Sequence, residues 1–208
     1  MDRDITLIFH NQGLRSFIEV DLCPECPRED DKGCCGYYSP VFYPTDLAYI
    51  MLTKPGLIDD IFRRPHLTIL DASVTVNSFI DVDDDGYRCQ FHSRQGGCQL
   101  PLKLRESVCR HFVCPGIAWW EEVSLQSWKE FFDRLTDYEI ATNNELAGTL
   151  KERGLTLREP GLRPLFFETL VPLYLDRIRN LPEFITRHPA QEKVVLRRRL
   201  VFGKDWRL

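Results

Sequence analysis

Large apolar side chains recur at every third or fourth position in the second half of the chain, as they do on one face of a helix. The positions are Leu125, Trp128, Phe132, Leu135 and Tyr138. Ser127 with Glu130 matches a capping box at the start of this helix, and Gly154 matches a stop at its end. A second helical stretch is expected over 165–179, where Pro172 must kink the helix or begin a new one.

The first half of the chain has a different pattern. Residues 41–52 (VFYPTDLAYIML) indicate the end of a strand followed by a short helix, with Thr45 or Asp46 as its cap. Residues 67–82 are rich in β-branched side chains and predict one or two strands. Residues 87–91 predict a strand that returns after a turn.

Together these elements predict an α+β fold class. A small, irregular cysteine-rich part with a few strands, residues 1–115, is expected to pack against a helical part, residues 116–208. Pro115 and Gly116 break regular structure and mark the boundary. We expect the two parts to form one unit.

Composition excludes several classes of protein. The 208 residues are 43% hydrophobic and 28% charged, which excludes a disordered chain. A net charge of -4 argues against general binding to nucleic acid, which needs concentrated Lys and Arg. No apolar run approaches the roughly 18 residues of a membrane span, and Met1 to Phe9 lacks the basic flank of a secretory signal. We therefore expect no membrane, no nucleic acid and a cytoplasmic location.

The eight cysteines change this picture, because a chain of this length does not need disulfides to fold. All of them lie between Cys23 and Cys114. The first group is Cys23-x2-Cys26-x7-Cys34-Cys35, and after 53 residues the second is Cys89-x8-Cys98-x10-Cys109-x4-Cys114. In a reducing compartment such a set predicts metal binding, and all eight are candidate ligands.

Spacing leaves the number of sites and the metal open. Two sets of four allow two sites, or one site that draws on both groups, and one or two cysteines could be ordinary core residues. Cys23-x2-Cys26 suits structural zinc, although a second tight knuckle is missing. Iron–sulfur clusters accept more scattered cysteines. Arg105 and Arg110 are candidate charge partners around the ligands, and His92 or His111 could replace a cysteine as ligand.

The order of these cysteines resembles that of the YkgJ-type cysteine-cluster proteins, which are described as a zinc- or iron-chelating domain. The matching elements are Cys23-x2-Cys26, Cys34-Cys35, Thr45-Asp46-Leu47, Cys89-x-Phe91, Cys98 and Arg105-x3-Cys109-Arg110-x-Phe112. Glu106 stands where the family has a proline, and one extra residue separates Cys98 from Arg105. The resemblance covers roughly residues 20–115 and implies metal binding. Some members of the wider family are flagellin lysine methylases, so a transferase-associated role is implied by analogy alone.

Two other segments have simpler explanations. Asp81, Asp83, Asp85 and Gly86 imitate a calcium loop, but position twelve would be His92 instead of glutamate, so an acidic turn is expected. The tail over 193–207 has six basic residues and one acidic residue. It could contact a partner, and its interleaved valines and leucines suit an amphipathic strand or helix equally well.

The function that we expect is that of an iron–sulfur protein, of the [4Fe–4S] type, with a redox or transferase-associated role. The alternative is a structural zinc module that acts as an interaction protein without catalysis, through a protein partner that the sequence does not identify. In both cases the candidate ligands are Cys23, Cys26, Cys34, Cys35, Cys89, Cys98, Cys109 and Cys114.

Overall fold

A computed structural model gives the fold of residues 1–28, 33–80, 87–93 and 96–207. It combines helices with small antiparallel sheets, so the predicted α+β class is confirmed. The turn and calcium-like pattern predicted over 81–86 lie outside the described residues. Within the described residues, no helix has the length and apolar character needed to cross a membrane.

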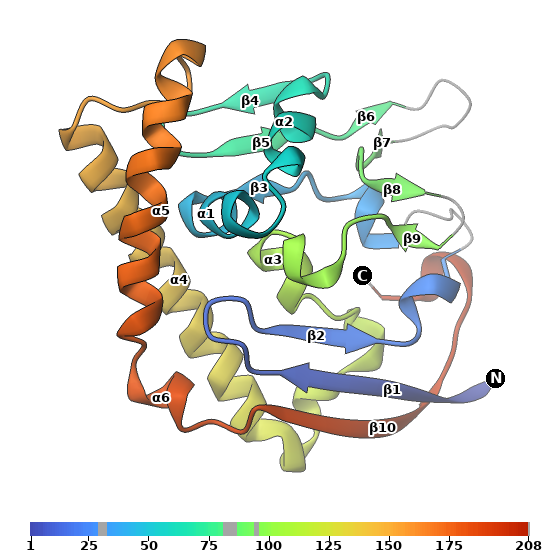
Figure 1. Cartoon of the computed structure of the whole chain (residues 1–208). Helices are drawn as coiled ribbons and strands as arrows, with labels where there is room; N and C mark the ends of the chain where they lie inside the picture. Colours follow the sequence, from blue (N-terminus) through green and yellow to red (C-terminus); the bar gives the residue numbers. More distant parts are fainter. Residues whose placement is uncertain (29–32, 81–86, 94–95, 208) are drawn as a thin grey trace.

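The largest sheet joins the two ends of the chain (Figure 1). Its central strand β1 (Asp2–His10) pairs antiparallel with β10 (Gln191–Arg199) on one side and β2 (Phe17–Val20) on the other. Every second residue from Ile5 to Phe9 is fully buried, as expected of a strand with one face on the core. Residues 1–115 and 116–208 thus share a sheet across the predicted boundary. The basic tail supplies β10, which alternates between exposed and half-buried positions.

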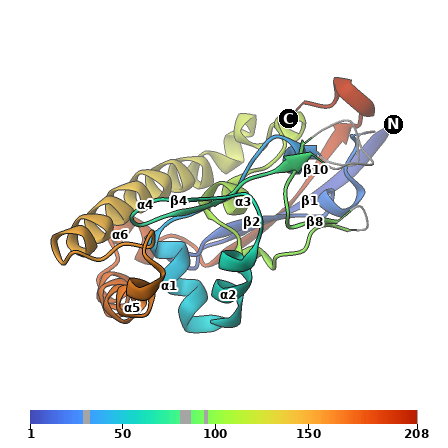
Figure 2. The same ribbon diagram turned by 90° about the horizontal axis from the view of Figure 1, so that it is seen from above.

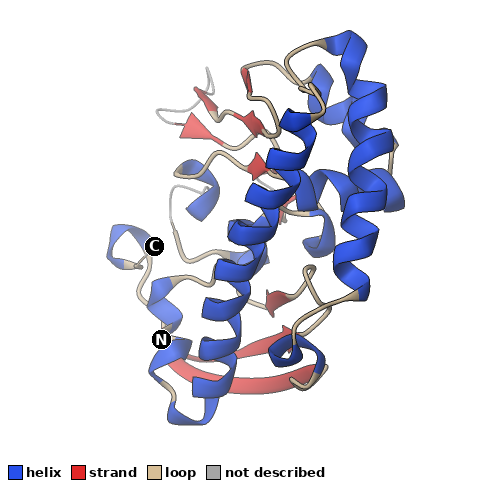
Figure 3. Ribbon diagram, turned by 90° about the vertical axis from the view of Figure 1, so that its left-hand side faces the viewer, coloured by secondary structure: helices blue, strands red, loops and turns tan. Residues whose placement is uncertain are grey.

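Helices cover one side of the molecule (Figure 3). They are α1 (Pro44–Thr53), α2 (Gly56–Arg63), α4 (Gln126–Glu152), α5 (Arg163–Arg179) and α6 (Glu183–Thr186). The two long helices predicted from apolar periodicity are α4 and α5. α5 is one helix that continues through Pro172. Gly154 follows the end of α4 with a φ of 71°, as the stop signal predicted.

The predicted helix caps are wrong. Leu125 is the N-cap of α4, so Ser127 is already the second residue of the helix and does not cap it. Tyr43 is the N-cap of α1, and Asp46 lies three residues further on, where its carboxylate accepts a hydrogen bond from the Tyr43 backbone N–H at 3.1 Å. Asp46 is fully buried, and its second oxygen accepts a hydrogen bond from Arg15. The local sequence around Asp46 does not reveal this contact.

The remaining described strands form three small antiparallel sheets. β3 (Val41–Phe42) and β4 (Leu67–Ile69) both pair with β5 (Val74–Val76). β6 (Phe79–Ile80) pairs with β7 (Tyr87–Arg88), and β8 (His92–Ser93) pairs with β9 (Gly97–Cys98). The described part of the predicted strand region, residues 67–80, therefore contains three short strands instead of one or two, and the predicted return strand is shorter than 87–91.

Short helical turns connect these elements. They are η1 (Cys23–Glu25), η2 (Gly33–Gly36), η3 (Leu102–Leu104), α3 (Ser107–His111), η4 (Pro115–Ile117), η5 (Trp119–Glu121), η6 (Val123–Leu125), η7 (Pro160–Leu162) and η8 (Gly203–Asp205). Figure 2, seen from above, shows α4 and α5 at one end of the molecule and β8 with the N terminus at the other. The cysteines belong to this second end.

Aromatic side chains join the sheet to α4. The ring of Phe9 on β1 lies 5.2 Å from Trp128 and 5.0 Å from Trp119, between ring centroids. Trp128 is fully buried and also packs on Phe132. Burial of such large rings contributes much of the core's stability. The aromatic cluster therefore fixes the sheet and the helices relative to each other.

Candidate metal centre

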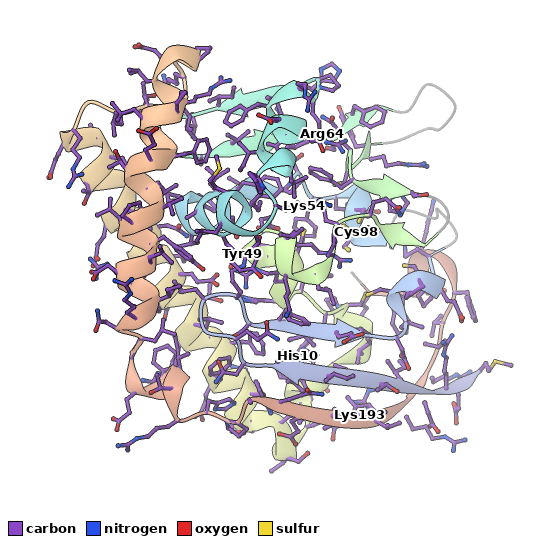
Figure 4. All side chains as sticks on the ribbon, in the orientation of Figure 1. His10, Tyr49, Lys54, Arg64, Cys98 and Lys193 are labelled. Atoms are coloured by element: carbon purple, nitrogen blue, oxygen red, sulfur yellow. The ribbon has the colours of Figure 1, made fainter. Side chains whose placement is uncertain are left out.

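One cavity brings together the cysteines of both sequence groups. Its volume is about 410 Å³, and all eight cysteines line it. They come from η1, η2, the β7–β9 region, α3 and the start of η4. Figure 4 shows Cys98 at this end of the molecule, beside β8 and β9. None of the eight, which all lie among the described residues, is part of a disulfide.

The first two cysteines are held by a stiff turn. Cys23 begins η1, Pro24 fixes the next φ angle, and Cys26 follows as the C-cap. Gly33 lies against this turn with a φ of 49°, and a Cβ added there would meet the Cys26 sulfur at 2.8 Å. A larger residue would both strain the backbone and displace the sulfur. Gly33 therefore allows η2, with Cys34 and Cys35, to approach η1 closely.

Backbone hydrogen bonds connect η2 to the short hairpins. The N–H of Cys89 donates to the carbonyl of Cys35 at 2.7 Å, and the N–H of His92 donates to the carbonyl of Cys89 at 3.0 Å. His92 lies opposite Cys98 in the β8–β9 pair. Three cysteines from separate segments are thus fixed by main-chain geometry.

Glu106 positions Cys109. The Glu106 carboxylate caps α3 by accepting the N–H groups of Val108 at 2.9 Å and Cys109 at 2.7 Å. Burial raises the pKa of Cys109, and the negative charge of Glu106 raises it further. Without a metal, Cys109 is therefore a protonated thiol, and a bound cation must displace its proton.

The C-terminal turn packs beside Cys114. The N–H of Gly203 donates to the carbonyl of Pro27 at 2.9 Å, so η8 lies beside η1 (Figure 1). Trp206 packs directly on Gly116, where an added Cβ would be 2.7 Å from its ring. Burial raises the pKa of Cys114 to about 11. The sequence gives no local signal that residues 200–207 belong to this site.

The two predicted charge partners lie in different places. Arg105 lines the cavity, and its charge is among the effects that lower the pKa of Cys34, after the hydrogen bond from the Cys35 side chain. Arg110 is fully buried and donates to Glu139 at 2.8 Å and to the carbonyl of Ser16 at 2.6 Å. The positive charge of Arg110 is therefore matched by Glu139.

A buried ion network lies under α3, and the sequence analysis missed it. Arg15 donates to Asp46 at 2.5 Å and to the carbonyls of Lys103 and Arg105. The Arg110 guanidinium is 3.9 Å from the same Asp46 carboxylate. One signal was present, because Glu139 falls on the apolar face of α4, four residues after Leu135.

The two histidines that are candidate ligands, His92 and His111, also lie in different places. His92 lines the cavity, whereas His111 packs its ring on Phe132 with centroids 5.0 Å apart. Burial lowers the pKa of His111 well below 6.5, and the charge of Arg110 lowers it further. His111 is therefore a neutral neighbour of the ion network.

The donor set suits a thiophilic metal. Among the described residues, no group of three or more His, Cys, Asp and Glu side chains is arranged to hold a metal ion. The thiols instead surround a cavity whose volume exceeds that of about ten water molecules. Apolar side chains, including Leu22, Phe91 and Ile117, form much of the remaining wall. The residues present therefore offer thiol ligands around one cavity.

Comparison of the chain with protein-family models, curated proteins and solved structures gives no match. The resemblance to YkgJ-type proteins therefore stays a prediction from the cysteine pattern.

Proposed function

We propose that this chain is an iron–sulfur protein that binds clusters of the [4Fe–4S] type in the cysteine cavity and serves a redox role. The observation that carries the proposal is that eight thiols from five separate segments line one cavity. When bound, such a cluster supplies one-electron transfer. Because thiols persist in reducing compartments, we also propose a cytoplasmic location.

The side chains around the cavity have defined tasks in this proposal. The cysteines hold the cluster as thiolates, and Arg105 offsets part of their negative charge. Leu22, Phe91 and Ile117 are buried in the wall and exclude water, which helps to set the reduction potential. The transferase-associated role implied by the family resemblance would use the same cavity.

A structural zinc module that acts through a protein partner is the second candidate. The stiff Cys23–Cys26 turn favours it, because zinc sites use this spacing. The spread of the other thiols around the cavity weighs against it, since one zinc ion draws four ligands to one point.

Metal and sulfide analysis separates the two candidates. We expect protein purified without oxygen to be brown, with equal amounts of iron and acid-labile sulfide and an electron paramagnetic resonance signal after reduction. Cys26→Ala should lose iron, whereas Ser127→Ala, at an exposed position of α4, should keep it. Stoichiometric zinc without sulfide, both before and after reconstitution with iron and sulfide, would overturn the proposal.

A further inference from the structure

We propose that the cavity contains two separate four-thiolate centres that cut across the two cysteine groups of the sequence. Cys23, Cys26, Cys34 and Cys114 ligate the first centre, and Cys35, Cys89, Cys98 and Cys109 ligate the second. The inference rests on the proposed function and extends it, because it assigns each ligand to a centre.

The first set gathers where the C-terminal turn meets η1. Cys23 and Cys26 belong to one turn, and the Gly203–Pro27 hydrogen bond ties η8 to that turn. The same C-terminal segment reaches Cys114, because Trp206 packs on Gly116 and the Gly116 N–H donates to the carbonyl of Arg207 at 3.4 Å. Cys114 is therefore held beside the first group although the sequence places it in the second.

The second set is connected by main-chain hydrogen bonds. The backbone N–H of Cys89 donates to the carbonyl of Cys35. The backbone N–H of His92 donates to the carbonyl of Cys89, and His92 pairs with Cys98 between β8 and β9. Two residues after β9 comes Leu100, whose carbonyl accepts the Nε–H of Arg105 at 2.9 Å. Arg105 begins the segment that carries Cys109. Cys35 is thus held beside the second group although the sequence places it in the first.

Cys34 and Cys35 form the border between the sets. They are consecutive residues of η2, and in such a helix successive side chains point about 120° apart. Adjacent ligands of this kind serve two neighbouring centres more easily than one. The two centres would therefore meet at this pair.

Paired substitutions test the assignment. Wild-type protein should hold about eight iron and eight sulfide per chain, the content of two [4Fe–4S] clusters. Cys26→Ala with Cys114→Ala removes two ligands of one centre and should halve both contents. Cys98→Ala with Cys114→Ala removes one ligand from each centre and should abolish both. Grouping by sequence predicts the opposite results for these two double variants.

The outcomes separate this inference from the proposed function. The half-loaded variant reports its own folding, because the remaining centre keeps its absorption and resonance spectrum. Wild-type protein with half the expected iron, or loss of all iron from the Cys26→Ala and Cys114→Ala double variant, would overturn the assignment and leave the iron–sulfur proposal standing. If the protein holds zinc without sulfide, the iron–sulfur proposal fails. Two zinc ions with the same pattern of loss would then still support the two sets, and any other pattern would overturn them.

Discussion

Replacing Glu139 by glutamine removes one charge from the buried network and almost preserves the shape of the side chain. Glu139 is 2% exposed, and its carboxylate accepts hydrogen bonds from Arg110 at 2.8 Å and from Ser107. Arg110 has no exposed surface. The substitution therefore leaves the Arg110 charge buried without its closest partner.

The expected cost follows from this burial. Removing one partner of a buried ion pair costs about 3–5 kcal/mol. Asp46, 3.9 Å from Arg110, retains part of the attraction, and the glutamine oxygen can still accept a hydrogen bond. We therefore expect a loss of about 3 kcal/mol in the free energy of unfolding. With a urea dependence of about 2 kcal/mol per molar, the unfolding midpoint falls by about 1.5 M.

Glu145→Gln is the matched control on the same helix. Glu145 pairs with Arg177, and both side chains are about half exposed, at 54% and 45%. An exposed pair contributes about 0–1 kcal/mol, so this variant should unfold nearly like the wild type. Both variants are compared by urea unfolding at equal iron content, because a bound group adds its own binding free energy. Equal stability of the two variants would refute the role assigned to the network.

Two further predictions concern the cavity and its pH dependence. Gly33→Ala should cost about 1–2 kcal/mol in backbone strain and lower iron content by displacing the Cys26 sulfur, whereas Gly161→Ala, which has open space, should change neither. His111 stays neutral in the folded state, because its pKa is lowered well below 6.5, whereas the same histidine in the unfolded chain takes up a proton below about pH 6.5. The free energy of unfolding should therefore fall as the pH decreases from 6.5 toward the lowered pKa of the folded state. The slope of the unfolding free energy against pH should be on the order of 1 kcal/mol per pH unit. Urea unfolding at several pH values should show a smaller slope in His111→Gln and the full slope in the exposed control His66→Asn. An unchanged slope in His111→Gln would contradict the role given to His111.

The sequence predicted elements whose signals are local. Apolar periodicity located α4, the helical stretch predicted over 165–179 corresponds to α5, and Gly154 marked the end of α4. It did not predict the central sheet, because β1 pairs with a strand more than 180 residues away and no local pattern encodes that partner. The interleaved apolar residues of the tail allowed a strand or a helix, and pairing with β1 decided between them.

The candidate ligands could be predicted from the sequence, but the proposed division of these ligands between two centres could not. A cysteine is visible in the sequence wherever it lies, so all eight could be named. Their neighbours depend on tertiary contacts such as that between Gly203 and Pro27. The ion network was missed because Arg15, Asp46 and Glu139 come from three distant segments, and Asp46 has a plausible local role as a helix cap.

The assignment of the cysteines also bears on how a metal would enter the fold. A zinc finger is unfolded without its metal, because a short segment supplies all its ligands and has little core. Here the Cys26 turn is brought to Cys114 by the C-terminal turn, which follows directly after β10. β10 is positioned by β1, and the ring of Phe9 on β1 packs on Trp128 of α4. We therefore expect the apolar core to arrange the cavity before any metal binds, so that a bound metal would stabilise the cysteine-rich end of a chain that is already folded.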